Sequence, residues 1–210
     1  MHTEQQILRV PLDHSVDWRF LLPFSQDETV LFVGDQSNYL KKVFEDMGFP
    51  AAAWPSTISL PDVSSLRLSQ STFHIVAMPY GMAADTPLGK TDATSIYGAV
   101  RAFLKPGGVL LLGFNNVFRG NDTKIPAASR GQIRKTLRRA GYLAINFYGV
   151  YPNVMIPEYI IPLELFPFLF AMDFHLRSRL PGSLLGILSN RLVFTGISNL
   201  LPAYFAVAKP

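Results

Sequence analysis

Three short apolar runs constrain the fold of this chain more than any other feature of its sequence. The runs are Val30–Val33, Phe73–Met78 and Val109–Phe114. Each is about as long as a strand, and Gly34 and Pro79 mark turns directly after the first two. Strands that are apolar along their whole length are buried on both faces, as in a parallel sheet covered by helices. The runs therefore predict an α/β domain.

Segments with helical character separate these runs along the chain. Helices are expected at Tyr39–Met47, Ser95–Leu104 and Ser129–Ala140. Further strands are expected at Pro50–Trp54, Tyr142–Val150 and Tyr204–Ala208. Strands that alternate with helices favour a three-layer, doubly wound, mostly parallel sheet. Because 210 residues suffice for one such domain with an elaboration, we expect a single domain over residues 1–210.

Two segments fall outside this alternation. Residues 1–28 are expected to form an N-terminal cap with a short helix, and residues 152–202 an apolar helical insertion before the last strand. Within the insertion, Met155–Met172 is nearly as long as a membrane span, but three prolines and two glutamates interrupt it. We therefore expect a helical lid over the edge of the sheet. A peripheral membrane or protein contact through residues 155–200 and a transmembrane helix remain as alternatives.

Composition excludes some classes of protein. The chain has no cysteine, which rules out disulfides and thiolate metal sites. Its four histidines show no ligand spacing with carboxylates, so no metal site is expected. The first residues, Met1–Gln6, contain an acid and no apolar run, unlike a secretory signal. A cytoplasmic location is expected, with peripheral attachment to a membrane as a variant.

The net charge of +4 reflects a local basic excess on one expected helix. Its cations are Arg130, Arg134, Lys135, Arg138 and Arg139. Aromatic residues are not interleaved with them, and the overall charge is modest, so no nucleic-acid partner is expected. The pattern favours a solvated helix face.

Four motifs occur in an order and spacing that resemble a known family. They are Val30–Leu40, Ser71–Val76, Val100–Leu110 with its Lys-Pro-Gly-Gly turn, and Leu137–Tyr142. In this order the chain resembles the class I methyltransferases that depend on S-adenosylmethionine (SAM), over roughly residues 28–150 and the final strand. The resemblance implies a seven-stranded Rossmann-like fold, SAM as the cofactor and methyl transfer as the reaction.

The first motif departs from the family in its cofactor-binding residues. The family has an acid two residues before the first glycine, which helps to hold the amino group of the cofactor, and that position is Phe32 here. The second and third loop glycines fall at Gln36 and Asn38, and no acid ends the second strand in Ala51–Pro55. Two missing charge-assisted hydrogen bonds of about 1.5–3 kcal/mol each would weaken SAM binding by two or more decades.

Candidate cofactor contacts lie mainly at the ends of the first and second apolar runs, because ligands of open α/β sheets bind at the carboxyl ends of the strands. The resemblance implies such contacts at Gly34, Asp35, Ser37, Asp62, Met78 and Tyr80. Asp35 either replaces the lost acid or caps the turn or the helix. Asp62 either contacts the adenine or is a loop residue. Trp54 either stacks on the adenine or packs in the core.

A base for methyl transfer is less clearly indicated. The candidates are His175 in the insertion, His14 near the cap and Tyr80 after the second run. His74 is expected to be structural, at the far end of its strand. Two functions stay open: a SAM-dependent methyltransferase acting on a small or lipophilic molecule, and a pseudo-methyltransferase that has lost SAM. The second would serve as a ligand-binding, repurposed-catalytic or protein-interaction module.

Overall fold

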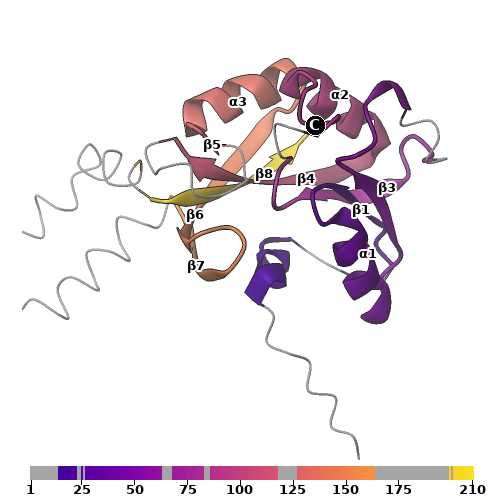
Figure 1. Cartoon of the computed structure of the whole chain (residues 1–210), viewed down its shortest axis with the longest axis horizontal. Coiled ribbons are helices and arrows are strands. Elements are labelled where there is room, and N and C mark those ends of the chain that lie inside the picture. Colours follow the sequence, from indigo (N-terminus) through magenta and orange to yellow (C-terminus); the bar gives the residue numbers. More distant parts are fainter. Residues whose placement is uncertain are drawn as a thin grey trace, which may run out of the picture.

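One eight-stranded sheet with helices on both faces organises the chain, as a computed structural model shows (Figure 1). The structure describes residues 14–22, 25, 27–62, 68–82, 86–117, 127–163, 199 and 201–210. Its strands are β1 (Val30–Gly34), β2 (Ala51–Pro55), β3 (Phe73–Met78), β4 (Leu104–Asn116), β5 (Ala127–Ala128), β6 (Ala144–Pro152), β7 (Pro157–Pro162) and β8 (Ala203–Lys209). Its helices are the 3-10 helix η1 (His14–Leu21), α1 (Ser37–Asp46), α2 (Ala93–Phe103) and α3 (Arg130–Arg139).

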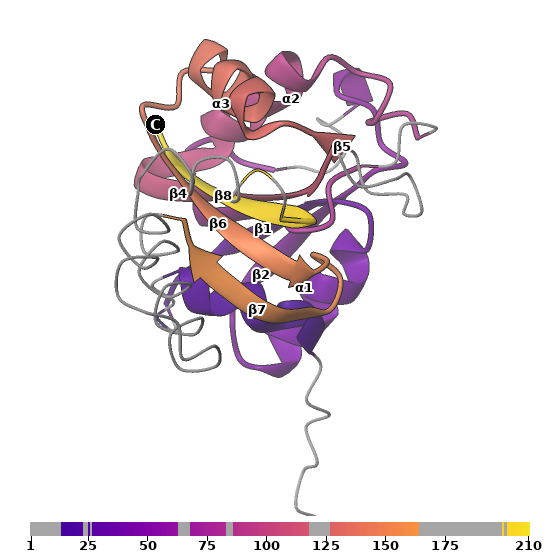
Figure 2. The ribbon, with the colours of Figure 1, turned by 90° about the vertical axis from the view of Figure 1, so that its left-hand side faces the viewer.

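The strand order is β2-β1-β3-β4-β8-β6-β7, with β5 paired to β4. The neighbours from β2 to β4 are parallel, whereas β8 runs antiparallel to β4 and β6, and β7 runs antiparallel to β6. The sheet is therefore mostly parallel and doubly wound, which confirms the fold class expected from the sequence. Figure 2 shows it edge-on between its helices.

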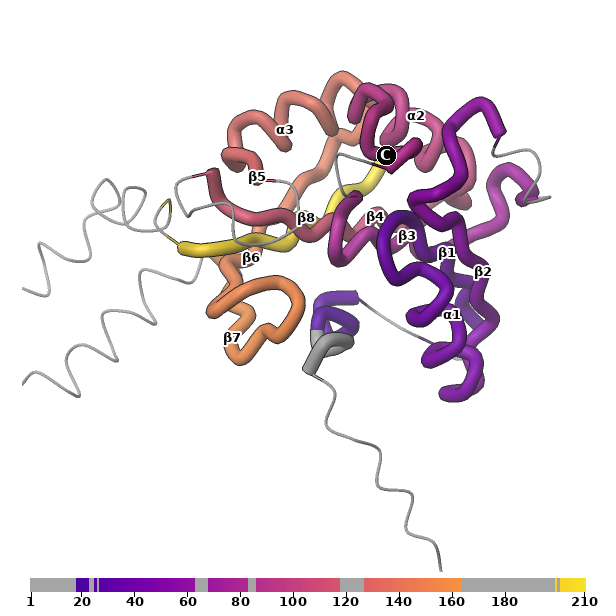
Figure 3. Tube along the Cα trace, in the orientation of Figure 1, coloured from indigo at the N-terminus to yellow at the C-terminus, as the bar shows by residue number. Residues whose placement is uncertain are grey.

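A hydrophobic core lies on each face of the sheet. Helices α2 and α3 cover one face, and buried Ile96, Val100, Ile133 and Leu137 turn their apolar sides to it. Helices η1 and α1 cover the other face, where Trp18 is fully buried. Figure 3 traces η1 beside β7 on this second face. The expected short helix of the N-terminal cap is thus present as η1.

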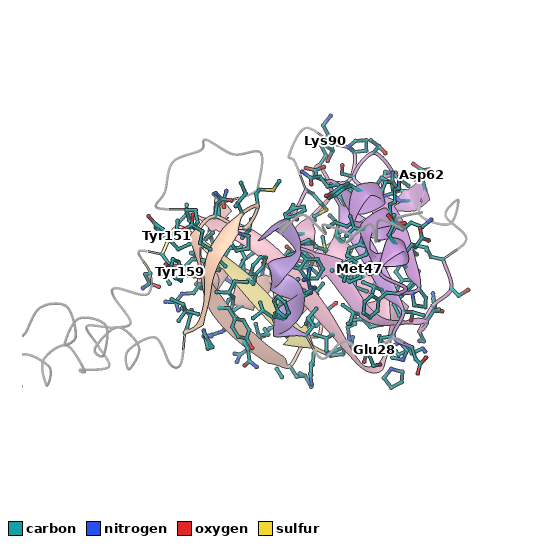
Figure 4. The ribbon with its side chains drawn as sticks, turned by 90° about the horizontal axis from the view of Figure 1, so that it is seen from below. Glu28, Met47, Asp62, Lys90, Tyr151 and Tyr159 are labelled. Atoms are coloured by element: carbon teal, nitrogen blue, oxygen red, sulfur yellow. The ribbon has the colours of Figure 1, made fainter. Side chains whose placement is uncertain are left out.

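The expected helical insertion is wrong for residues 157–162, which form the edge strand β7. Prolines stand at both ends of this strand and disfavour a helix interior, and Tyr159, Ile160 and Ile161 between them favour strand geometry. Tyr151 on β6 lies opposite Tyr159 in the ladder, and Figure 4 shows both side chains at this outer edge. Residues 164–198, and with them most of the expected lid, lie outside the described residues.

Two glycines let the segment after β3 lie directly against the neighbouring strands. A Cβ atom on Gly34 of β1 would stand 2.2 Å from the carbonyl oxygen of Gly81. A Cβ atom on Gly113 of β4 would stand 1.9 Å from the carbonyl oxygen of Pro79. Both distances are far inside van der Waals contact. The segment 79–82 is therefore pressed onto β1 and β4 through positions that only glycine can occupy.

Alanine substitutions separate this contact from backbone strain. Gly34 has φ +99° as well as the close contact, whereas Gly48 has φ +88° with no atom within 4 Å of its added Cβ. We expect Gly48→Ala to lower the free energy of unfolding by about 1–2 kcal/mol, the strain of a left-handed residue. Gly34→Ala should lower it by clearly more, about 3 kcal/mol or above.

Gly113→Ala should also exceed Gly48→Ala, because it meets the contact without a left-handed φ. Urea unfolding of the three variants measures these differences. Equal losses for Gly34→Ala and Gly48→Ala would mean that segment 79–82 does not lie against β1.

Candidate functional site

The carboxyl ends of β1, β2, β3 and β4 meet at one edge of the sheet, because these strands are parallel. This is the edge at which ligands of open α/β sheets bind. The turn after β1 passes through Gly34 at φ 99° and Gln36 at φ 59°, and α1 begins at Ser37. Gln36 is the N-cap residue of α1 and makes no side-chain capping bond. Asp35 is therefore not the N-cap residue of this helix but lies in the turn before it, in agreement with the turn interpretation.

Asp35 joins three strand ends instead. Its Oδ1 accepts a hydrogen bond from Oγ of Ser56 at 2.5 Å, and Ser56 directly follows β2. Its backbone N–H donates to the carbonyl oxygen of Gly81, after β3, at 3.3 Å. In a cofactor-binding loop such N–H groups point at the ligand. Here the N–H of Asp35 is engaged by the chain itself.

Phe32 occupies the family's acid position as a fully buried core residue. Its ring meets Phe44 of α1 edge-on with centroids 4.8 Å apart, and meets Trp18 of η1 at 6.1 Å. Trp18 and Phe44 stack on each other at 5.7 Å with 9° between their planes. The three rings form an aromatic cluster, Trp18–Phe32–Phe44, that joins η1, β1 and α1. An ammonium group would find an apolar wall at this position.

Met78, the last residue of β3, and Tyr80 just after it are buried in the two cores. Met78 is fully buried in the core under α2 and α3, and Tyr80, 2% exposed, lies in the core under η1 and α1. Both were predicted as cofactor contacts, and Tyr80 also as a catalytic residue. Their burial in these apolar clusters favours a packing role for each.

Ser37 is the predicted contact that best fits a bound ligand. It is the first residue of α1 and is 2% exposed. Its Oγ has no hydrogen-bond partner within the described part of the chain. A buried hydroxyl without a partner is unfavourable, and a ligand with an acceptor atom at the start of α1 would relieve this.

Asp62 and Trp54 have local partners. Asp62 is exposed, and its Oδ2 accepts a hydrogen bond from Oγ of Ser59 at 2.5 Å. Figure 4 shows Asp62 at the periphery, on the same side as Lys90. Trp54 is fully buried, and its Nε1 donates to the carbonyl oxygen of Ile58 at 3.0 Å. The loop interpretation of Asp62 and the core interpretation of Trp54 are therefore the better ones.

The histidine candidates do not meet at this edge within the described residues. His175 lies outside them, and of His14 only the backbone, in η1, is described. His74 stands at the opposite edge, where its Nδ1 accepts from the N–H of Thr29 at 3.0 Å. Its Nε2 lies 3.3 Å from Nζ of Lys105. These contacts agree with the structural role expected for His74.

Ser56 is a site residue that sequence reasoning missed, and so are the partners of Asn116 at the end of β4. Asn116 is 2% exposed and ends β4, and its Nδ2 donates to the carbonyl oxygen of Leu201 at 2.7 Å and to Oη of Tyr204 at 3.2 Å. Burial raises the pKa of Tyr204 and the nearby Arg130 lowers it, with burial dominant, so the phenol stays neutral. Because these partners are more than 80 residues apart, no local pattern could reveal them.

Neither a metal site nor a membrane-spanning helix is found among the residues that the structure describes. They contain no group of three or more His, Asp or Glu side chains able to hold a metal ion. They also contain no helix long and apolar enough to cross a membrane.

Comparisons with known proteins bear on the fold. No family model matches the sequence, and no curated protein matches it. A SAM-dependent methyltransferase from Archaeoglobus fulgidus is similar in structure, with a TM-score of 0.55 and 9% identity over 93% of this chain and 92% of its own. A possible histamine N-methyltransferase from Thermotoga maritima has a TM-score of 0.49 and 11% identity, over 94% of this chain and 87% of its own.

Haemonchus contortus phosphoethanolamine N-methyltransferase 2, solved with S-adenosylhomocysteine, has a TM-score of 0.48 and 13% identity. The match covers 91% of this chain and 51% of that one, so this chain spans about half the length of that protein. The chain has the fold of the class I SAM-dependent methyltransferases, which confirms the resemblance expected from the sequence.

Several positions at which the resemblance implies contacts with SAM hold other side chains here. The position of the acid that meets the amino group holds Phe32, inside the aromatic cluster. The position of the second glycine holds Gln36, and the N–H of Asp35 is bonded to Gly81. At the end of β2, where the family binds the ribose, the hydroxyl of Ser56 donates to Asp35. Ser37 alone among these residues presents an unused polar group within the described chain.

Two substitutions at Phe32 test its role in the aromatic cluster. Phe32→Leu should lower the free energy of unfolding by about 1–1.5 kcal/mol, because it keeps an apolar group of similar volume. Phe32→Asp should lower it by about 4 kcal/mol or more, because it removes the ring and buries a carboxylate. Thermal unfolding measures both. A Phe32→Asp variant as stable as Phe32→Leu would show that position 32 faces a polar site.

Proposed function

We propose that this chain is a methyltransferase-fold protein that does not hold SAM in the manner of the family, and that it serves as a binding and interaction module. The observation that carries the proposal is the hydrogen bond from the N–H of Asp35 to Gly81, together with the close contact of Gly81 with Gly34. These contacts join the ends of β1 and β3 at the edge where ligands of open α/β sheets bind.

The aromatic cluster supports the same proposal from the opposite side of β1. Phe32 stabilises the packing of η1 on the sheet, so the position of the acid now belongs to the core. Restoring an acid there would place a charge among three aromatic rings without a partner. Contacts that stabilise the fold have thus replaced contacts that would bind the cofactor.

A SAM-dependent methyltransferase acting on a small or lipophilic molecule is the second candidate. The partnerless Oγ of buried Ser37 favours it, because this hydroxyl stands at the start of α1 where a ligand acceptor would fit. Methyl transfer from a sulfonium needs proximity and orientation more than a strong base, so the reaction does not require a histidine at this edge. Cofactor affinity separates the two candidates.

Calorimetric titration of the intact chain with SAM and with S-adenosylhomocysteine measures this affinity directly. With two charge-assisted bonds absent, we expect either no heat or dissociation constants no lower than about 10–100 μM. Sub-micromolar binding would overturn the proposal and favour the methyltransferase candidate.

A double variant tests whether the loop glycines alone are missing. Gln36→Gly with Asn38→Gly restores the family's spacing and leaves Phe32 and Gly81 in place. Because Gln36 has φ 59°, the glycine there removes strain and the variant should remain folded. We expect SAM affinity to stay as weak as in the unmodified chain. A gain of about tenfold or more, roughly one charge-assisted bond, would show that these two side chains block the cofactor.

A further inference from the structure

A second surface, at the amino edge of the sheet, combines cations with an exposed leucine. Its cations come from the end of α3, the end of α2, the start of β4 and the end of β8. They are Arg138, Arg139, Arg101, Lys105 and Lys209. Within the described residues no carboxylate forms an ion pair with any of them, since the ion pair found there joins Lys41 and Glu45. We call these five side chains, together with Leu143, the basic edge.

The members of the basic edge lie side by side. The guanidinium of Arg101 rests on the turn after α3, because a Cβ atom on Gly141 would stand 2.5 Å from its Nη1. Arg101 and Lys105 line one hollow of about 320 Å³ together with Pro210. The N–H of Leu143 donates to the carbonyl oxygen of Lys209 at 2.9 Å. Figures 1 and 2 both show the C-terminus beside α2 and α3.

Leu143 stands out among the apolar side chains of this region. It is 79% exposed, the largest fraction for any large apolar side chain described, and it follows Arg138 and Arg139 after a short turn. A solvated leucine gains free energy when it enters an apolar phase. Amphipathic helices that bind membranes combine Lys and Arg with apolar side chains that enter the boundary between lipid headgroups and acyl chains. The basic edge combines the same types of residue.

We propose that the basic edge docks on the surface of a membrane that contains anionic lipid. The five cations would lie against the phosphate and carboxylate groups of the lipid headgroups, and Leu143 would insert among them. The proposal is independent of SAM binding, because this edge is the amino edge of the sheet, opposite the ends of β1 and β3. It also differs from a contact through residues 155–200.

Nucleic acid fits this surface less well. Binding to single strands uses exposed aromatic rings on which bases stack. The exposed aromatic side chains that the structure describes are Phe20, Tyr39, Tyr151 and Tyr159, on η1, α1, β6 and β7. None belongs to the basic edge. An exposed aliphatic residue among cations fits lipid better than it fits a base.

Co-sedimentation of the full chain with vesicles tests the proposal. We expect binding to phosphatidylcholine vesicles with about 30 mol% phosphatidylserine, no binding to pure phosphatidylcholine vesicles, and a loss of binding as salt rises above about 0.1 M. Absence of binding to the anionic vesicles at low salt would overturn the proposal. So would tighter binding of a DNA duplex than of the vesicles under the same conditions.

Matched variants identify the surface. Arg138→Gln with Arg139→Gln should weaken binding by about fivefold for each cation removed, and Leu143→Ser by about tenfold at most. Lys41→Gln with Lys42→Gln removes the same charge from α1, on the other face of the sheet, and should weaken binding far less. Because these side chains are at the surface, circular dichroism should show all three variants folded. Equal losses for the two charge variants, or unchanged binding of both the Arg138/Arg139 and the Leu143 variants, would overturn the proposal.

Discussion

The contact between Gly34 and Gly81 is the constraint on which the rest of the site depends. It brings the end of β3 onto the end of β1, and the N–H of Asp35 completes it with a hydrogen bond to the same carbonyl oxygen. Asp35 then fixes Ser56 at the end of β2. A change that separated β1 from segment 79–82 would therefore disturb three strand ends together, because the same few atoms hold them.

A second set of contacts lies on the face of the sheet that η1 and α1 cover. The aromatic cluster of Trp18, Phe32 and Phe44 joins η1 to the sheet through β1. In a cofactor-binding relative, the side chain at the position of Phe32 would meet the ligand. Here it stabilises the protein itself. Under the function proposed above, the two sets of contacts would stabilise the fold without the cofactor, because packing holds the fold and function depends on individual site residues.

Much of the fold could be predicted from the sequence, because long apolar runs and glycine stops are local signals. Phe73–Met78 was predicted to the residue, and α1, α2 and α3 were predicted within two residues at either end. The two-residue strand β5 was not predicted, and β4 begins at Leu104 instead of Val109. The larger error was β7, a run of apolar residues that was interpreted as helix although prolines stand at both ends of the strand. Such runs are ambiguous until the sheet supplies a partner strand.

The site was less predictable, for a physical reason. The departures at Phe32, Gln36 and Asn38 were visible, since they break a spacing within a few residues. The contacts of Asp35 at this edge were not visible, because it meets Gly81 and Ser56 only after the strands have paired. From the sequence, Asp35 was expected either to replace the family's missing acid or to cap the turn or the helix. Its observed partners lie 21 and 46 residues away in the chain. Sequence reasoning located the edge of the sheet and could not say what fills it.

The most direct test of the central claim is a backbone amide NMR titration with S-adenosylhomocysteine, preceded by hydrogen exchange of the free protein. If the chain's own contacts close the carboxyl edge of the sheet, the amide of Asp35 exchanges slowly because it donates to the carbonyl oxygen of Gly81. Millimolar ligand then shifts the amide signal of neither Asp35 nor Gly81. Rapid exchange at Asp35, with saturable shifts of the amides of Gly34, Asp35, Ser37 and Gly81, would contradict the account and identify an open cofactor site.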